Sequence, residues 1–326
     1  MKDESKAPKA AAKVRVSAPA SCANLSSGFD VFGIALEHPR DEVSVALGTG
    51  STPSTSRIRI IARGEFRVPS APEENAAGAV ALAMAREHGI RHPIEITLLK
   101  MVRPGVGLGS SAASSAGAAV ATNEFFRLGL SVRELIRFAS LGEKAASGTA
   151  HFDNVTASIV GGFAVSAFGG RGAPVSFDPP PHLRACLVTP SLELPSKKTE
   201  FARSLLPRSV PLNSMTHNIA MASSLVAGFA KSDIGLIGRG MEDLVVEPAR
   251  KRMIPGYDVV RENAMASGAV GVGISGAGPT MLAFVDSSKA SAAAVLTAMK
   301  AGFASSGVRA GGFVTGIGKG ARILHA

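Results

Sequence analysis

A glycine- and serine-rich loop between an expected strand and an expected helix limits most strongly what this chain can fold into. The loop reads RPGVGLGSSAASS over residues 103–115. Gly105, Gly107 and Gly109 allow positive φ angles and a close approach of the backbone to a bulky anion. Ser110 and Ser111 fall in the first turn of the helix, where free N–H groups and the helix dipole favour phosphate and a hydroxyl can ligate Mg2+. The loop therefore predicts a phosphate-binding site.

Other loops that bind phosphate or carry a nucleophile fit this segment less well. A Walker A loop requires Gly-Lys-Ser/Thr, which is absent. A hydrolase elbow requires Gly-x-Ser-x-Gly, which neither Ser110 nor Ser111 supplies. A turn without any ligand stays open as an interpretation when this segment is taken alone.

A second glycine-rich segment, VGVGISGAGPT over residues 270–280, contains a formal Gly-x-Gly-x-x-Gly pattern. A dinucleotide site would place an acidic residue about 20 positions later and begin a helix after the glycines. The last acidic residue of the chain is Asp286, however, and Pro279 follows the glycines. The pattern therefore favours a plain hairpin turn, whose backbone can approach a neighbouring ligand.

Residues 17–36 pair an amide, Asn24, with a carboxylate, Asp30, around a flexible turn. An aspartate suits recognition of an ammonium group, but Asn and Asp are also common turn formers. Both interpretations stay open for this segment.

Polar side chains are dense over residues 142–163, before an apolar stretch. Glu143 lies at the end of an expected helix, and we expect His151, Asp153 and Asn154 in the loop that follows. Such groups can position a hydroxyl nucleophile or a metal-bound phosphate. A single histidine is usually structural, so the prediction rests on the cluster.

The composition excludes several classes of protein. The 35 basic and 25 acidic residues give a net charge of +10, but the positive charges form no block and aromatic residues make up only 5%. Base-stacking platforms are therefore scarce, and we expect no nucleic-acid partner. No apolar run approaches the ~20 residues of a membrane span, so we expect no membrane partner. Two cysteines give no disulfide framework, which fits a cytoplasmic protein.

Strand-like and helix-like segments interleave without βαβ regularity, which predicts two α+β domains. We expect strands over residues 13–18, 41–47, 58–62, 94–101, 183–189, 269–274, 280–285 and 311–315. We expect helices over residues 75–88, 110–126, 131–143, 215–230, 234–244 and 288–303. Residues 169–181 are the segment richest in Gly and Pro and mark the expected domain junction.

Three segments, in this order, resemble the signature motifs of the GHMP kinase superfamily. They are residues 19–33, 104–113 and 271–280. Further stretches resemble the homoserine kinase branch of that superfamily. They are His151-Phe152-Asp153-Asn154, Gly161-Gly162-Phe163, TEFARSLLP over residues 199–207 and EPARKRMIPG over residues 247–256. The resemblance covers nearly everything from Val14 to Val285.

The resemblance implies a fold and an activity. The fold would be α+β, with an N-terminal domain like domain 2 of ribosomal protein S5 over residues 13–172 and a ferredoxin-like domain over residues 173–326, after a disordered tail at residues 1–12. The activity would be ATP-dependent phosphorylation of the L-homoserine hydroxyl in threonine biosynthesis, with Mg2+ and in a homodimer. Another GHMP kinase, acting on mevalonate or a sugar, is the nearest alternative. A basic nucleic-acid-binding protein and a nucleotide-binding protein without catalysis are more distant ones.

The resemblance also implies residue roles. Mg2+ would be shared by Ser111 and Glu143. Either Asp153 would be the general base, or Asn154 would position the hydroxyl so that no strong base is required. The ATP site would consist of Asn75, Pro104, Gly105, Val106, Gly107, Leu108, Gly109, Ser110, Ser111 and Ala112. The substrate site would consist of Asn24, Asp30, His151, Asn154, Thr199, Arg203, Arg250 and Gly276. Within it, Asp30 would hold the ammonium group, Arg203 and Arg250 would clamp the carboxylate, with Arg252 as a rival of Arg250, and His151 and Asn154 would orient the hydroxyl.

Overall fold

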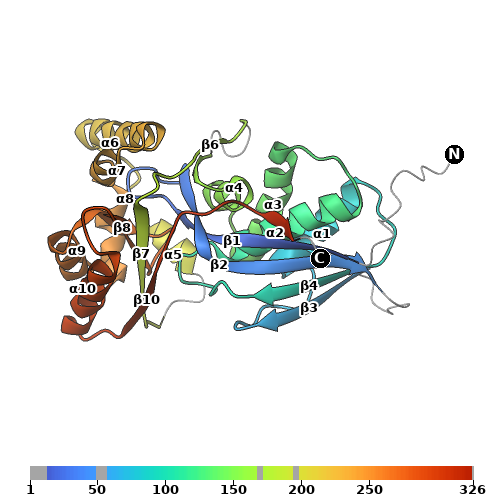
Figure 1. Ribbon diagram of the computed structural model, residues 1–326. Helices are drawn as coiled ribbons and strands as arrows, with labels where there is room; N and C mark the ends of the chain where they lie inside the picture. Colours follow the sequence, from blue (N-terminus) through green and yellow to red (C-terminus); the bar gives the residue numbers. More distant parts are fainter. Residues whose placement is uncertain (1–12, 49–56, 167–171, 194–197, 325–326) are drawn as a thin grey trace.

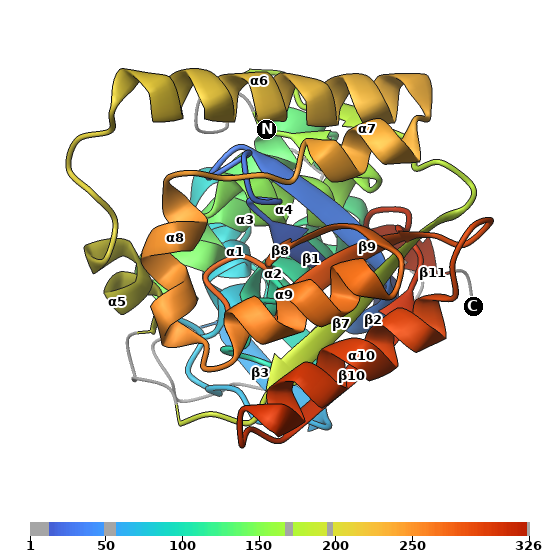
Figure 2. The same ribbon diagram turned by 90° about the vertical axis from the view of Figure 1, so that its left-hand side faces the viewer.

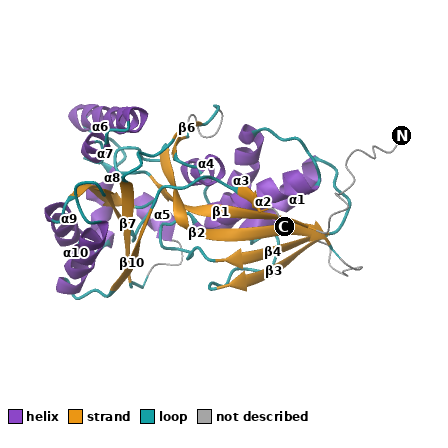
Figure 3. Ribbon diagram, in the orientation of Figure 1, coloured by secondary structure: helices purple, strands orange, loops and turns teal. Residues whose placement is uncertain are grey.

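The computed structural model describes residues 13–48, 57–166, 172–193 and 198–324, and these residues form two packed units, each with its own sheet (Figure 1). The tail predicted at residues 1–12 lies outside the described residues, and so does part of the junction predicted at 169–181. Strands and helices mix in both units, as Figure 3 shows by colour. Within the described residues, no helix is both long enough and apolar enough to cross a membrane.

The first unit is built on a seven-stranded sheet. Its strands are β1 (Lys13–Ala23), β2 (Phe32–Leu47), β3 (Ile58–Gly64), β4 (Ile94–Lys100), β5 (Phe163–Val165), β6 (Val175–Phe177) and β11 (Arg322–Leu324). The main path runs β11-β1-β2-β4-β3, and β5 and β6 extend from β2. Only β3 and β4 pair in parallel among these strands.

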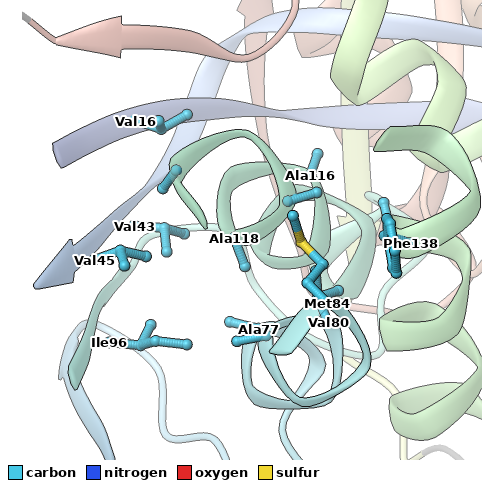
Figure 4. Packing of buried hydrophobic residues seen from close by; sticks show 14 of the residues in the cluster. Val16, Val43, Val45, Ala77, Val80, Met84, Ile96, Ala116, Ala118 and Phe138 are labelled. Atoms are coloured by element: carbon cyan, nitrogen blue, oxygen red, sulfur yellow. The ribbon is translucent and has the colours of Figure 1, made fainter. Parts of the chain in front are cut away.

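Four helices accompany this sheet, namely α1 (Ala76–Glu87), α2 (Ser110–Phe125), α3 (Val132–Ser147) and α4 (Phe152–Val160). The residues of α2 are mostly Ala, Ser and Gly, so its backbone approaches the sheet closely. Figure 4 shows Ala116 and Ala118 among Val16, Val43 and other apolar side chains of the sheet and the neighbouring helices. The helix α3 begins with a capping box, because Ser131 and Glu134 cap each other's backbone N–H groups.

The second unit contains a four-stranded antiparallel sheet in the order β10-β7-β9-β8. The strands are β7 (Leu183–Pro190), β8 (Ala269–Ile274), β9 (Met281–Asp286) and β10 (Ala310–Thr315). The helices are α5 (Lys198–Ser204), α6 (Leu212–Lys231), α7 (Ile234–Arg239), α8 (Val246–Arg250), α9 (Tyr257–Ala266) and α10 (Ala292–Ser305). Strands and helices follow one another as in a ferredoxin-like unit. Figure 2 shows α9 and α10 side by side over one face of this sheet.

The alternation of β7 explains how the two units are joined. Cys186 and Val188 face the core beneath α9 and α10. Leu183, Ala185 and Leu187 lie on the opposite face, in a core that they share with α6, α7 and the first sheet. Both units therefore contribute to one hydrophobic cluster, which fixes how they sit against each other.

The chain enters the second unit after β6 and returns to the first unit in β11. The short strand β6 pairs with β5, and β11 pairs antiparallel with β1, with Arg15 opposite Leu324. The predicted boundary between residues 172 and 173 stays a prediction, and the sheet pairing shows that strands from beyond residue 172 contribute to the first sheet.

Candidate active site

The two glycine-rich segments and the first polar segment meet at the boundary of the two units. The turn between β8 and β9 is the predicted hairpin, and it contacts both of the other segments. The backbone N–H of Gly276 donates to Ala23 O at 3.0 Å, and Ser275 Oγ donates to Gly107 O at 2.6 Å. Segments far apart in the sequence thus form one surface.

Steric contacts explain the glycines of the phosphate loop. At Gly107 (φ 91°) a Cβ atom would lie 2.3 Å from Ser275 O, and at Gly109 (φ 58°) it would lie 2.0 Å from Ser21 Oγ. Both positions therefore require glycine for space and for the left-handed backbone. Gly109 is the N-cap of α2, so the N-terminal N–H groups of this helix are directed at the loop.

A cavity of about 560 Å³ lies along this surface. Most of the predicted site residues line it, namely Asn24, Asp30, Asn75, Pro104, Gly105, Gly107, Leu108, Gly109, Ser110, Ser111, Glu143, His151, Asp153, Asn154, Thr199, Arg203, Arg250 and Gly276. Val106 and Ala112 do not, because their side chains are buried in the hydrophobic cores of the protein. Arg250 lines the cavity whereas its rival Arg252 does not.

Asn75 has a structural task in addition to its place at the cavity. Its Oδ1 accepts hydrogen bonds from Ala77 N and Gly78 N and caps α1, and its Nδ2 donates to Pro69 O at 2.7 Å. Pro69 and Arg67 line the same end of the cavity and were not expected from the sequence.

A buried ion pair lies under the phosphate loop and was also not expected. Lys100, 1% exposed, donates through Nζ to Asp41 Oδ2, to Ser110 O at 2.7 Å and to Ser114 Oγ at 3.0 Å. Asp41 Oδ1 in turn accepts from the backbone N–H of Val102. Burial lowers the pKa of Lys100, and the charge of Asp41 opposes that shift. The pair holds the first turn of α2 against the end of β4.

The turn between β1 and β2 is more constrained than the flexible turn that we expected. Asn24, Leu25, Ser26 and Asp30 all have positive φ angles. Asn24 Oδ1 accepts from Asp30 N, and Ser26 Oγ donates at 2.9 Å to Glu247 Oε1 in α8. A left-handed backbone at residues other than glycine is strained and is common at ligand-binding sites.

Two arginines of the second unit meet this turn. Arg203 Nη2 donates to both carboxylate oxygens of Asp30, at 2.9 Å each, and its Nε has no hydrogen-bond partner among the described residues. Arg250 Nη1 donates to Gly276 O at 3.2 Å. Both guanidinium groups lie over the ring of Phe29, at 5.6 and 5.0 Å from its centre.

Glu143 lies within the last turns of α3, which continues to Ser147, and faces His151. Its Oε1 lies 3.0 Å from His151 Nδ1. Burial alone lowers the pKa of His151, but the hydrogen bond and charge of Glu143 outweigh it and raise the pKa. The second oxygen, Glu143 Oε2, is buried and has no partner among the described residues. This oxygen and the Ser111 hydroxyl are hard oxygen donors on the wall of the cavity, and they fit a Mg2+ ion that is held mainly by nucleotide phosphates.

The prediction that Asp153 and Asn154 lie in a loop is wrong. Both residues lie in the first turn of α4, whose N-cap is His151. Asp153 is 2% exposed, and burial raises its pKa to about 6, partly offset by the charge of His151. Asn154 Oδ1 accepts from Ser21 Oγ at 2.9 Å. Histidine is not a preferred N-cap residue, which explains why the start of this helix was missed.

Comparison with known proteins identifies this arrangement. The family models described as GHMP kinases N terminal domain and GHMP kinases C terminal match residues 75–162 and 225–305. The chain is 42% identical to a homoserine kinase of Natronomonas pharaonis, over 95% of this chain and 100% of that protein. It is also 42% identical to one of Methanocella arvoryzae, over 96% and 97%. The chain belongs to the homoserine kinase family of GHMP kinases.

Solved structures agree with membership in the homoserine kinase family. A homoserine kinase from Cytophaga hutchinsonii superposes with a TM-score of 0.87 at 34% identity, covering 97% of this chain and 98% of that one. The L. major mevalonate kinase, at 14% identity and a TM-score of 0.70, covers 96% and 100% and shares the fold. The predicted two-domain GHMP kinase fold is therefore confirmed.

Proposed function

We propose that the protein transfers the γ-phosphoryl group of ATP to the side-chain hydroxyl of L-homoserine, giving O-phospho-L-homoserine for threonine biosynthesis. The observation that carries this proposal is the Asp30–Arg203 ion pair beside Arg250 and Phe29. It places one carboxylate and two guanidinium groups at the end of a cavity that begins at a phosphate loop.

This set of charges complements an amino acid. The ammonium group of a bound amino acid would pair with Asp30, and its carboxylate would pair with Arg203 and Arg250. One exposed ion pair would thus be replaced by contacts to both charges of the ligand. Mevalonate carries a carboxylate but no ammonium group, and a neutral sugar carries neither, so both leave Asp30 without a new partner.

The transfer would place the acceptor hydroxyl near Asn154 and Asp153. The hydroxyl oxygen forms the new bond to the γ-phosphorus, the bond from that phosphorus to the β–γ bridging oxygen breaks, and ADP leaves with the electron pair. The hydroxyl proton passes to Asp153, which is ionised at neutral pH because its pKa is about 6. Phosphoryl transfer has a loose transition state, so positioning and neutralisation of charge carry most of the catalysis.

Mg2+ would be held by Ser111 and Glu143 together with the nucleotide. When bound, the ion neutralises charge on the phosphate oxygens and fixes their orientation. Glu143 also orients His151 through the 3.0 Å contact, so the imidazole and the ion would share one carboxylate.

We also propose that the enzyme is a cytoplasmic homodimer. The apolar side chains of Leu212, Met215 and Ile219 follow one side of α6 and are 72%, 46% and 58% exposed. An apolar stripe of this kind supports a contact between subunits. Light scattering coupled to gel filtration measures the mass, and a monomeric mass at micromolar concentration would reject the dimer.

The decisive measurement is coupled ADP release with Mg-ATP and a panel of L-homoserine, mevalonate, galactose and L-threonine. We expect strong turnover with homoserine alone. In the Arg203→Ala variant the KM for homoserine rises about 100-fold, because the carboxylate loses a charge-assisted contact, while the KM for ATP stays within about threefold. Turnover with mevalonate or galactose instead of homoserine would agree with a GHMP kinase but would reject homoserine as its substrate.

A further inference from the structure

Lys198, the first residue of α5, carries an ammonium group that is buried in the wall of the cavity, and no carboxylate of the described residues forms an ion pair with it. The residue is 9% exposed, and its Nζ donates to Gly278 O in the turn between β8 and β9. Within the described part of the chain it forms no ion pair. Buried cations are normally paired, because removing an unpaired charge from water is costly. Among the described residues Lys198 therefore has no anionic partner, and a bound ligand can supply one.

The position of Gly278 brings Lys198 close to the phosphate loop. Gly278 O lies only 2.9 Å from the place that a Cβ atom on Gly107 would take. The Nζ atom bound to this carbonyl therefore approaches the phosphate loop from the side of the second unit. Arg250 approaches α5 as well, since its Nε donates to Ala202 O at 3.4 Å. Burial together with the charge of Arg250 lowers the pKa of Lys198 to about 8.

Lys198 thus lies between the groups assigned to the nucleotide and those assigned to the acceptor. The γ-phosphoryl group crosses this space during an in-line transfer. The other lysine that lines the cavity among the described residues, Lys100, is already neutralised by Asp41. The arginines Arg203 and Arg250 face the acceptor end, where Asp30 lies.

We propose that Lys198 binds the γ-phosphoryl group of ATP and neutralises the charge that develops on it during transfer. The inference rests on the proposed function for the acceptor, but nucleotide binding tests it without any acceptor. Lys198 takes up and releases no proton in the step and stays an ammonium group throughout. The hydrogen bond from Lys198 Nζ to Gly278 O holds the ammonium group next to Gly107 of the phosphate loop, where it can reach the phosphate.

The first test compares nucleotides that differ in the γ-phosphate. Isothermal titration calorimetry with ADP and with the β,γ-imido analogue of ATP is carried out on the wild type and on Lys198→Met, Lys198→Arg and Lys231→Met. Lys231 is an exposed lysine in the last turn of α6, so its variant controls for the loss of one positive charge. We expect Lys198→Met to weaken the binding of the imido analogue at least tenfold and the binding of ADP less than twofold. An equal loss for both nucleotides would overturn the proposal.

The second test separates binding of the phosphate from binding of the acceptor. We expect the kcat of Lys198→Met with homoserine to fall about 100-fold, as for loss of one transition-state donor. Lys198→Arg should recover most of this loss, and the KM for homoserine should change less than threefold. A rise in the KM for homoserine with unchanged kcat would assign Lys198 to the acceptor carboxylate and reject the proposal.

Failure of the substrate assignment would look different from failure of this inference. If the wild type does not phosphorylate homoserine, the proposed function fails, whereas the comparison of ADP with the imido analogue still decides the role of Lys198. Thermal melting verifies that each variant is folded. If Lys198→Met does not fold, Lys198→Gln, which keeps a hydrogen-bond donor to Gly278 O but no charge, takes its place with the same expected outcomes.

Discussion

Asp153 is a carboxyl group that the fold buries beside the cavity, with its Oδ1 accepting from the backbone N–H of Asn154 at 2.7 Å. If it accepts the proton of the substrate hydroxyl, the Asp153→Asn variant loses about 100-fold or more in kcat, because the amide cannot accept that proton. Steady-state kinetics at pH 7.5 measures the loss. A loss of tenfold or less would show that Asp153 is not the base. Positioning of the substrate hydroxyl by Asn154 would then be the remaining explanation.

The same carboxyl group links activity and stability to pH. Because its pKa is raised to about 6 by burial, kcat/KM should fall as the pH drops below about 6. The folded-state pKa lies above the ordinary value of 3.8, so this group favours the folded state below pH 4 and loses that contribution as the pH rises through 6. The Asp153→Asn variant should therefore melt at a higher temperature than the wild type at pH 7.5, and the difference should shrink at pH 5. A lower melting temperature at pH 7.5 would contradict this.

Single residues were predictable where their chemistry is visible in a local segment. The glycines and serines of the phosphate loop, and the pair Asn24 and Asp30, stand together in the sequence and line one cavity in the structure. The sequence did not predict the roles of Lys100, Asp41 and Lys198, because each role depends on a partner that only tertiary packing brings close. An isolated lysine or aspartate gives no local signal.

Among the elements, the turn of residues 24–31 is held to the second unit by several hydrogen bonds, one of which comes from the strained residue Ser26. Ser26 has a φ of 61°, and its hydroxyl binds the buried Glu247. We expect Ser26→Ala to destabilise the protein by about 1–3 kcal/mol, since a buried acceptor loses a donor. Ser26→Gly should cost less, because glycine relieves the left-handed strain.

Denaturant unfolding of the two Ser26 variants side by side measures this difference. Both lose the hydroxyl, so the comparison isolates the backbone. If Ser26→Gly were the more destabilised variant, the strain at this position would be negligible.

At the scale of elements, periodic segments with clear ends were predicted well. The helix α1 and the strand β4 were expected within one residue of their observed bounds. The strand β1 extends to Ala23, five residues beyond its predicted end, across an irregularity between Pro19 and Ser21. The short elements β5, β6 and β11, of three residues each, have too little pattern of their own and exist through pairing with neighbours.

At the scale of the whole molecule, Glu247 joins the two units through one buried carboxylate. It accepts from Ser26 of the first unit, from Tyr257 Oη at 2.8 Å and from Ile274 N at 2.7 Å. Burial raises its pKa to about 7, against the opposing effect of these hydrogen bonds. The group therefore favours the folded state below pH 4.5 and loses that contribution as the pH rises through 7. The free energy of unfolding falls over this range by on the order of 3 kcal/mol.

We expect the Glu247→Gln variant to lose this dependence on pH between 4.5 and 7. Glutamine keeps the shape, and its amide can donate to the Tyr257 oxygen, so the variant should fold and be at least as stable as the wild type at pH 7.5. The free energy of unfolding as a function of pH measures the effect, and Glu262→Gln, at an exposed position, should retain the wild-type slope. Equal slopes for Glu247→Gln and the wild type would show that this carboxylate does not titrate in the range.

The assembly of two α+β units was predicted from interleaved segments and the order of the motifs. The way in which they are joined was not. The shared core of β7, α6 and the first sheet depends on which face of β7 each apolar residue occupies, and β7 is apolar on both faces.

The pairing of β1 with β11 has a consequence for synthesis on the ribosome. The strand β1 emerges first among the strands of the described residues, yet one of its two neighbours, β11, arrives some 300 residues later, at Arg322–Leu324. At about 5–20 residues per second, this leaves β1 with an unoccupied side for tens of seconds. An open strand side can pair with a foreign chain. A nascent chain of this enzyme would therefore be most vulnerable to misassembly while the second unit is being translated, and a chaperone that covers β1 would act in that interval.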